Sequence, residues 1–191
     1  MNTLDTIAAR RSIRRFKDTP LPDGALQAIL TAATQAPSAK NRQPWRFVVV
    51  QGDQRAEMVR VMRQGIEAMV AQGHDTGSAL GSARIMEQAP VTVFVLNPEG
   101  LHPWLTRSVE QMSTDVMNIQ SIGAAIQNML LAALDLGLGS LWIGDICYAY
   151  EALREWLGTE SQLIAAVSFG YADESPPARP RRSADQVTRW M

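Results

Sequence analysis

The chain has 191 residues, 46% of them hydrophobic, and a formal net charge of −1 at pH 7. This length predicts one domain over residues 1–191, with a core large enough to need no disulfide or metal. The near-neutral charge argues against a protein that works on nucleic acid or on an anionic membrane, because proteins that do so usually have a strongly basic surface. No nucleic-acid or membrane partner is therefore expected.

The cysteine and histidine content argues against an internal disulfide and against a metal site. Cys147 is the one cysteine, so no internal disulfide can form, and we expect it to be an inert buried thiol. The two histidines have no companions at metal-ligand spacing, so no metal site is predicted. The first residues show neither the basic region nor the apolar run of a secretory signal, and we expect a cytoplasmic protein.

Hydrophobic periodicity predicts helices separated by strands. Helices are expected over residues 4–9, 22–36, 54–72, 109–136 and 150–157. Strands are expected over residues 45–50, 91–96, 138–144 and 163–170. Unequal helices between strands favour a three-layer α+β arrangement, in which helix 109–136 is the central helix and a candidate dimer seam.

Three other segments are expected to be irregular. Residues 73–82 contain three glycines and should be mobile, either as a substrate-facing lid or as an ordinary surface loop. Residues 97–104 raise the same alternatives. From residue 171 onward the chain is rich in proline and arginine, and residues 187–190 can add a strand to the sheet edge of a partner.

Two basic clusters lie at opposite ends of the chain, one over residues 10–15 and one over residues 179–182. On an extended segment Arg10, Ser12 and Arg14 project to one side, where guanidinium forks and a hydroxyl suit a phosphate. The alternatives are a solvated charge run and a nucleic-acid patch. A divided anion-binding site is the functional interpretation.

A polar loop bounded by two prolines precedes the first strand. It reads Pro37-Ser38-Ala39-Lys40-Asn41-Arg42-Gln43-Pro44. Such a loop either presents backbone groups to a ligand or is a simple connector.

Four motifs in one order are more specific than any of them alone. They are Arg10-Arg11-Ser12-x-Arg14-x-Phe16, Ala36-Pro37-Ser38-Ala39-Lys40-Asn41-x-Gln43-Pro44-Trp45-x-Phe47, Leu136-Gly137-Leu138-Gly139-Ser140-x-Trp142-Ile143-Gly144, and Gly170-Tyr171 with Arg181. Together they resemble the FMN-dependent nitroreductase family, in the form of its small bacterial members, over residues 5–190.

The resemblance implies a three-layer α+β fold with a central mixed or antiparallel sheet flanked by helices. It also implies a homodimer in which C-terminal tails are exchanged between protomers and two FMN molecules lie at the subunit interface. Arginines and one serine of the two basic clusters should hold the FMN phosphate: Arg10, Ser12 and Arg181, with Arg179 assisting and Arg11 nearby. Arg14 should approach N1 and O2 of the isoalloxazine.

Two further segments should contact the flavin ring if the resemblance holds. The proline-bounded loop contributes Pro37, Ser38, Ala39 and Asn41, the first three from the other subunit. The glycine-rich strand contributes Trp142, Ile143 and Gly144 near the N5 edge, with a backbone N–H contact. No catalytic side chain and no metal are implied.

The implied activity is transfer of two electrons, as hydride through flavin N5, from NADH or NADPH to an electron-poor acceptor such as a nitroaromatic or quinone, in a ping-pong cycle. Three alternatives stand beside it. They are a specialised branch of the same fold (a reductive dehalogenase or a flavin-consuming enzyme), a flavin-holding protein without turnover, and a nucleic-acid-binding module that uses the arginine clusters.

Overall fold

The computed structural model describes residues 2–191. Its helices are α1 (Thr3–Ala9), α2 (Ala25–Thr34), α3 (Gln54–Ala71), α4 (Ala79–Gln88), α5 (Val109–Asp135), α6 (Tyr150–Leu157) and α7 (Ala184–Val187). Its strands are β1 (Arg46–Gln51), β2 (Val91–Asn97), β3 (Gly139–Ile143) and β4 (Gln162–Gly170). Two short 3₁₀ turns, η1 (Ala39–Asn41) and η2 (Asp145–Ala149), complete the regular structure.

The four strands form one antiparallel sheet in the order β1-β2-β4-β3. Periodicity locates each strand but carries no information on this order, because pairing is set by contacts between distant segments. The central strand β2 is buried along its whole length, as expected for a strand covered on both faces.

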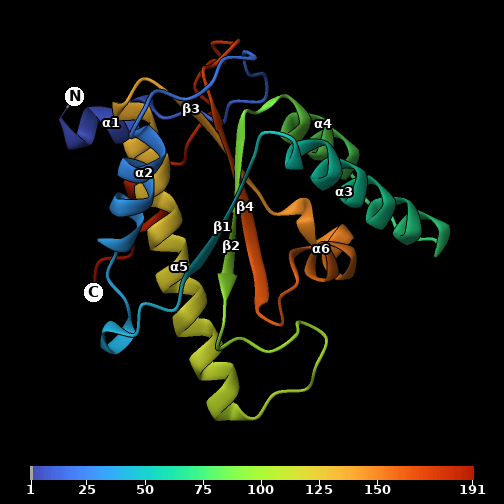
Figure 1. Cartoon of the computed structure of the whole chain (residues 1–191). Helices are drawn as coiled ribbons and strands as arrows, with labels where there is room; N and C mark the ends of the chain where they lie inside the picture. The colour runs from blue at the N-terminus through green and yellow to red at the C-terminus, as the bar shows by residue number, and fades with distance from the viewer. Residues whose placement is uncertain (1) are drawn as a thin grey trace.

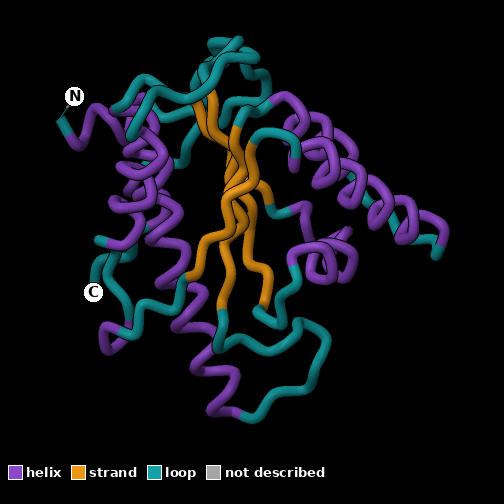
Figure 2. The backbone as a smooth tube through the Cα atoms, in the orientation of Figure 1, coloured by secondary structure: helices purple, strands orange, loops and turns teal. Residues whose placement is uncertain are grey.

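Helices cover both faces of the sheet, which gives three layers (Figures 1 and 2). Val93, Val167 and Phe169 point into the core beneath α2 and α5. Phe94 and Ala166 point into a second core beneath α3, α4 and α6. This is the three-layer α+β arrangement that the sequence predicts, and the sheet is antiparallel throughout.

The long helix α5 begins and ends at residues suited to those positions. The Ser108 hydroxyl accepts the Gln111 N–H at 3.2 Å, while the Gln111 side chain accepts the Ser108 N–H at 2.9 Å, a capping box. At the other end Gly137 has a φ of 75°, and the Leu138 N–H donates to Ala133 O at 2.8 Å. This glycine turn sends the chain from α5 directly into β3.

The prediction of an irregular segment over residues 73–82 is wrong at its C-terminal end. Helix α4 begins at Ala79, so the last four residues of this segment are helical. Its buried face consists of Ala79, Ser82, Ala83 and Met86, which follow helical spacing but are mostly small. Small residues and the three spaced glycines at positions 73, 77 and 81 give a weak periodic signal, and for that reason the pattern indicated a loop.

Residues 12–17 run along the end of the sheet. The Ile13 N–H donates to Ser140 O at 3.0 Å, at the start of β3. The Lys17 N–H donates to Tyr171 O at 2.9 Å, just after β4. These bonds bring the segment after α1 beside the segment after β4 (Figure 1).

The structure also bears on membrane and metal binding. No helix within residues 2–191 is long and apolar enough to cross a membrane. In the same part of the chain, no three side chains of the types His, Cys, Asp and Glu gather into a group that could hold a metal ion.

Candidate functional site

The two basic clusters, which lie at opposite ends of the sequence, line one cleft of about 700 Å³. Its walls come from α1, the segment after it, α5 and the C-terminal segment. They are Ile7, Ala8, Arg10, Arg11, Ser12, Arg14, Gln127, Pro176, Pro177, Ala178, Arg179, Pro180 and Arg181. Among the described residues, five arginines and no carboxylate line this cleft, so its lining is strongly cationic.

Several of these guanidinium groups are held in place by backbone carbonyls. Arg11 Nη1 donates to Ala8 O at 2.8 Å and to Arg10 O at 2.9 Å. Arg181 Nη1 donates to Pro180 O at 3.1 Å and, like Arg14, is exposed. Because a guanidinium has five N–H donors, each keeps donors for a ligand.

The predicted alternation along residues 10–15 is confirmed in part. Ile13 is buried in the core, whereas Ser12 and Arg14 line the cleft. Arg11 lines the cleft as well, although strict alternation would place it on the other side. Arg15 is not among the residues that line the cleft, and its Nε pairs with Glu174 Oε2 at 3.7 Å.

A smaller cavity of about 180 Å³ adjoins this cleft between α5 and β3. Arg10, Ser12 and Gln127 line both cavities, and the indole of Trp142 forms another wall of the smaller one. Trp142 is 43% exposed, so much of its large aromatic side chain is open to solvent. The recess therefore continues from a strongly cationic end to an aromatic wall.

Ile143 and Gly144 follow Trp142 but do not share its position. The Ile143 side chain is buried in the core under α3 and α6, so only its backbone can meet a ligand on the recess side. Gly144 lies between the end of β3 and the start of η2.

The proline-bounded loop lies apart from this recess within one chain. The Ala39 N–H donates to the Ser121 hydroxyl at 3.4 Å. Ser121 and Gln127 are six residues apart on α5 and so lie on different sides of the helix. One chain therefore brings together the arginines and Trp142 but not Pro37, Ser38, Ala39 and Asn41.

This loop has a strained backbone. Lys40, Asn41 and Gln43 have φ values of 53°, 53° and 52°, in the left-handed region that non-glycine residues seldom occupy. The Ser38 hydroxyl accepts the Gln43 N–H at 3.0 Å and closes the loop on itself. Such strain persists only where surrounding contacts hold it, and it is common at functional sites.

Sequence reasoning missed some residues of the recess. Gln127 is a wall of both cavities, and the prolines at positions 176 and 177 complete the cationic end. The one signal for Gln127 was a polar side chain in the largely apolar second half of α5.

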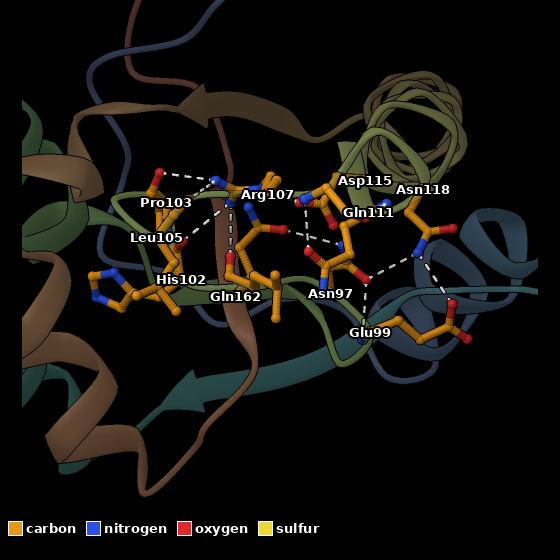
Figure 3. Close-up of polar contacts among 12 residues, drawn as sticks. Asn97, Glu99, His102, Pro103, Leu105, Arg107, Gln111, Asp115, Asn118 and Gln162 are labelled. Carbon is orange, nitrogen blue, oxygen red and sulfur yellow. Dashed lines mark hydrogen bonds and ion pairs between the residues drawn. The ribbon is translucent and has the colours of Figure 1, made fainter. Parts of the chain in front are cut away.

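The segment from residue 97 to residue 108 is pinned by one side chain (Figure 3). Arg107 Nε donates to Asp115 Oδ2 at 2.5 Å, and its two terminal nitrogens donate to four backbone carbonyls of the segment. Those carbonyls belong to Leu101, His102, Pro103 and Leu105. With all five donors used, Arg107 favours a fixed loop over a moving lid.

Cys147 differs from its predicted environment, because it is exposed rather than buried. Partial burial of the sulfur, together with the negative charge of Asp145, raises the pKa of the Cys147 thiol. A raised pKa keeps the thiol protonated at neutral pH, so the group is a poor nucleophile.

Comparisons with known proteins agree on one family. The sequence model of the Nitroreductase family matches residues 7–171. A protein of Archaeoglobus fulgidus that carries the name NADH dehydrogenase/NAD(P)H nitroreductase is 34% identical over 97% of this chain and 96% of its own. The NADPH-flavin oxidoreductase of Vibrio harveyi is 28% identical over 97% of this chain and 72% of its own.

A solved structure extends the agreement to three dimensions. The structure of a nitroreductase from Desulfovibrio desulfuricans in complex with FMN is 29% identical in sequence and superposes with a TM-score of 0.77, covering 100% of this chain and 98% of that one. With a family match over most of its length and relatives that span it from end to end, this chain belongs to the nitroreductase family.

Proposed function

We propose that the protein is a cytoplasmic, homodimeric FMN oxidoreductase that passes two electrons from NADH or NADPH to an electron-poor acceptor such as a nitroaromatic or a quinone. The observation that carries this proposal is the continuous recess with five arginines at one end and the exposed face of Trp142 at the other. The cationic end suits the phosphate of FMN, and the aromatic wall suits its flat isoalloxazine ring.

The cationic end fits a phosphate ester. Arg10, Ser12 and Arg181 would hold the phosphate, with Arg179 beside them and Arg11 near. Because no carboxylate of residues 2–191 lines the cleft, these arginines lack an anionic neighbour there, and a dianionic group would supply one.

The ring would be held by groups that also tune its chemistry. When bound, FMN supplies the redox step, taking a hydride at N5 from the nicotinamide and releasing two electrons to the acceptor in a ping-pong cycle. The Arg14 guanidinium would lie near N1 and O2, where a fixed positive charge stabilises the reduced anion. The backbone of residues 142–144 would face the N5 edge.

An exposed apolar stripe on α5 supports the homodimer. Val109, Met112, Val116 and Ile119 follow one another at intervals of three and four residues and are 80%, 57%, 49% and 41% exposed. The same spacing continues to residues 123 and 127, so the stripe leads to the recess. A second copy covering the stripe would reach the recess, and its loop would supply Pro37, Ser38 and Ala39.

An absorption spectrum of the purified protein tests the proposal. A yellow protein with flavin bands, or one that takes up added FMN, is expected, and anaerobic titration with NADH and with NADPH should bleach it. Reoxidation by a nitroaromatic but not by a halophenol would separate this activity from reductive dehalogenation. A colourless protein that fails to take up FMN would refute the proposal.

A further inference from the structure

Two buried amide side chains meet where the end of β2 lies beside α5 (Figure 3). Asn118 on α5 is 1% exposed, and Asn97 at the end of β2 is 0% exposed. The Asn118 Nδ2 donates to Asn97 Oδ1 at 3.4 Å and to Glu99 Oε2 at 3.2 Å. Asn97 in turn accepts the Glu99 N–H at 3.2 Å. Asn97 therefore holds the backbone of Glu99, and Asn118 holds its carboxylate.

Asn118 is oriented for donation at a cost. Its Oδ1 is buried and has no hydrogen-bond partner among the described residues. A buried acceptor without a partner is destabilising and rare in native proteins. The opposite orientation of the amide would be less favourable still, because it would place Oδ1 against the oxygens of Asn97 and Glu99. The Asn118 amide therefore holds the Glu99 carboxylate, although its own Oδ1 stays unpaired.

Glu99 contacts the strained loop of residues 37–44 through an ion pair with Arg42. Its Oε2 pairs with Arg42 Nη1 at 3.5 Å. Exposed ion pairs are usually weak, because two flexible side chains must be ordered to form them. Here the carboxylate is already held by Asn118, so less side-chain entropy is lost when Arg42 binds it.

Ser121 holds the same loop one turn further along α5. It is 6% exposed, donates to Met117 O at 2.7 Å and accepts the Ala39 N–H at 3.4 Å. Asn118 and Ser121 are three residues apart and share one side of the helix. The exposed stripe of α5 occupies a different side.

We propose that Asn118 and Ser121 are positioning residues, which keep the loop of residues 37–44 in its left-handed conformation for the flavin reaction. Asn118 acts through Glu99 and Arg42, and Ser121 acts on Ala39 directly. Three left-handed non-glycine residues in one loop would relax without such contacts. The inference rests on the proposed function, because that function assigns the loop to the flavin of the partner subunit.

Four variants test this role. Ser121→Ala removes the acceptor of the Ala39 N–H, and Ser121→Thr keeps a hydroxyl there. Asn118→Asp replaces the donor that faces Glu99 with an oxygen. Ser168→Ala is the control, since it removes another buried hydroxyl, hydrogen-bonded to Thr92 at 2.8 Å within the sheet and remote from the loop.

Hydrogen exchange of the backbone amides of residues 38–43 and steady-state kinetics are measured on the flavin-loaded protein. Ser121→Ala and Asn118→Asp should each speed exchange, and lower kcat/KM for a nitroaromatic acceptor, by about two- to tenfold, the factor of one hydrogen bond. The Kd for FMN should change less than the kinetics do, because the arginine cleft holds the phosphate. Ser121→Thr should restore both readouts, and Ser168→Ala should lower Tm only.

Unchanged exchange in both variants would overturn the proposal. Faster exchange with an unaltered kcat/KM in an active, flavin-loaded enzyme would overturn it as well. Exchange is also measured on the flavin-free protein. If the wild type binds no flavin, the proposed function fails, whereas the exchange data still decide whether Asn118 and Ser121 hold the loop.

Discussion

Single side chains in the first basic cluster take opposite roles over very short distances. Ile13 is 7% exposed and packs in the core, while its neighbours Ser12 and Arg14 line the cleft. Because successive side chains of an extended segment alternate, burying Ile13 turns its neighbours outward. At this scale the core determines the direction of the cationic groups, and their chemistry determines what they can bind.

Arg181→Ala is expected to weaken FMN binding by about 1.5 to 3 kcal/mol, the range for hydrogen bonds to charged groups. The loss follows from removing one of five guanidinium groups in the cleft. Fluorescence titration of the flavin-free protein with FMN measures the Kd. Arg189→Ala is the matched control, because Arg189 is exposed and lies outside the cleft lining. An equal Kd for both variants would contradict the role assigned to Arg181.

At the scale of elements, close approach of the first basic segment to the sheet depends on two glycines. A Cβ at Gly139 would lie 2.9 Å from Ile13 Cγ1. A Cβ at Gly170 would lie 2.9 Å from Phe16 Cδ1 and 2.7 Å from Pro90 Cδ. Both distances are too short for carbon atoms, so glycine at these ends of β3 and β4 lets residues 12–17 lie against the sheet.

Gly139→Ala is expected to destabilise the protein by about 1 to 3 kcal/mol, the usual cost of overpacking. Urea unfolding at one fixed protein concentration measures the change. Gly81→Ala is the control of opposite sign. Gly81 lies inside α4, and a Cβ added there would meet no atom within 4 Å, so alanine should stabilise by about 0.5 to 1 kcal/mol. A Gly139→Ala variant with the same free energy of unfolding as the wild type would contradict the close packing of Ile13 against position 139.

At the scale of the whole molecule, the three layers leave one side of the long helix α5 exposed along its first half. α5 buries one side against the sheet and holds the loop of residues 37–44 with another. Its remaining side carries the apolar stripe from Val109 to Ile119. An uncovered apolar stripe of this length is unfavourable in contact with water, which supports the proposed homodimer.

Ile119→Glu is expected to convert the proposed homodimer to monomers and to release FMN. A carboxylate buried without a partner costs several kcal/mol, enough to disrupt most dimer interfaces. Light scattering coupled to size-exclusion chromatography measures the mass, and absorbance measures the flavin content. Val70→Glu, at a position 52% exposed on α3 in the other layer, should alter neither. A wild-type monomer that holds FMN would refute the interface.

Much of the element pattern could be predicted from the sequence because it depends on local periodicity. Helix α6 begins and ends at the predicted residues, 150 and 157, and the other predicted helices and strands exist within a few residues of their expected bounds. Helix α4 was missed because its inner face uses small side chains. The family was also readable, because four motifs in one order were already present in the chain.

Other properties exist only in the folded molecule, since they depend on distances between remote residues. The order β1-β2-β4-β3, the meeting of the two basic clusters and the wall formed by Gln127 are set by packing between segments far apart in the chain. The same holds for Asn118, whose buried amide has no signature in periodicity or motif. Periodicity and motif order in the sequence therefore specify the elements and the family, whereas only folding specifies which groups meet, because burial and pairing are properties of contacts across the chain.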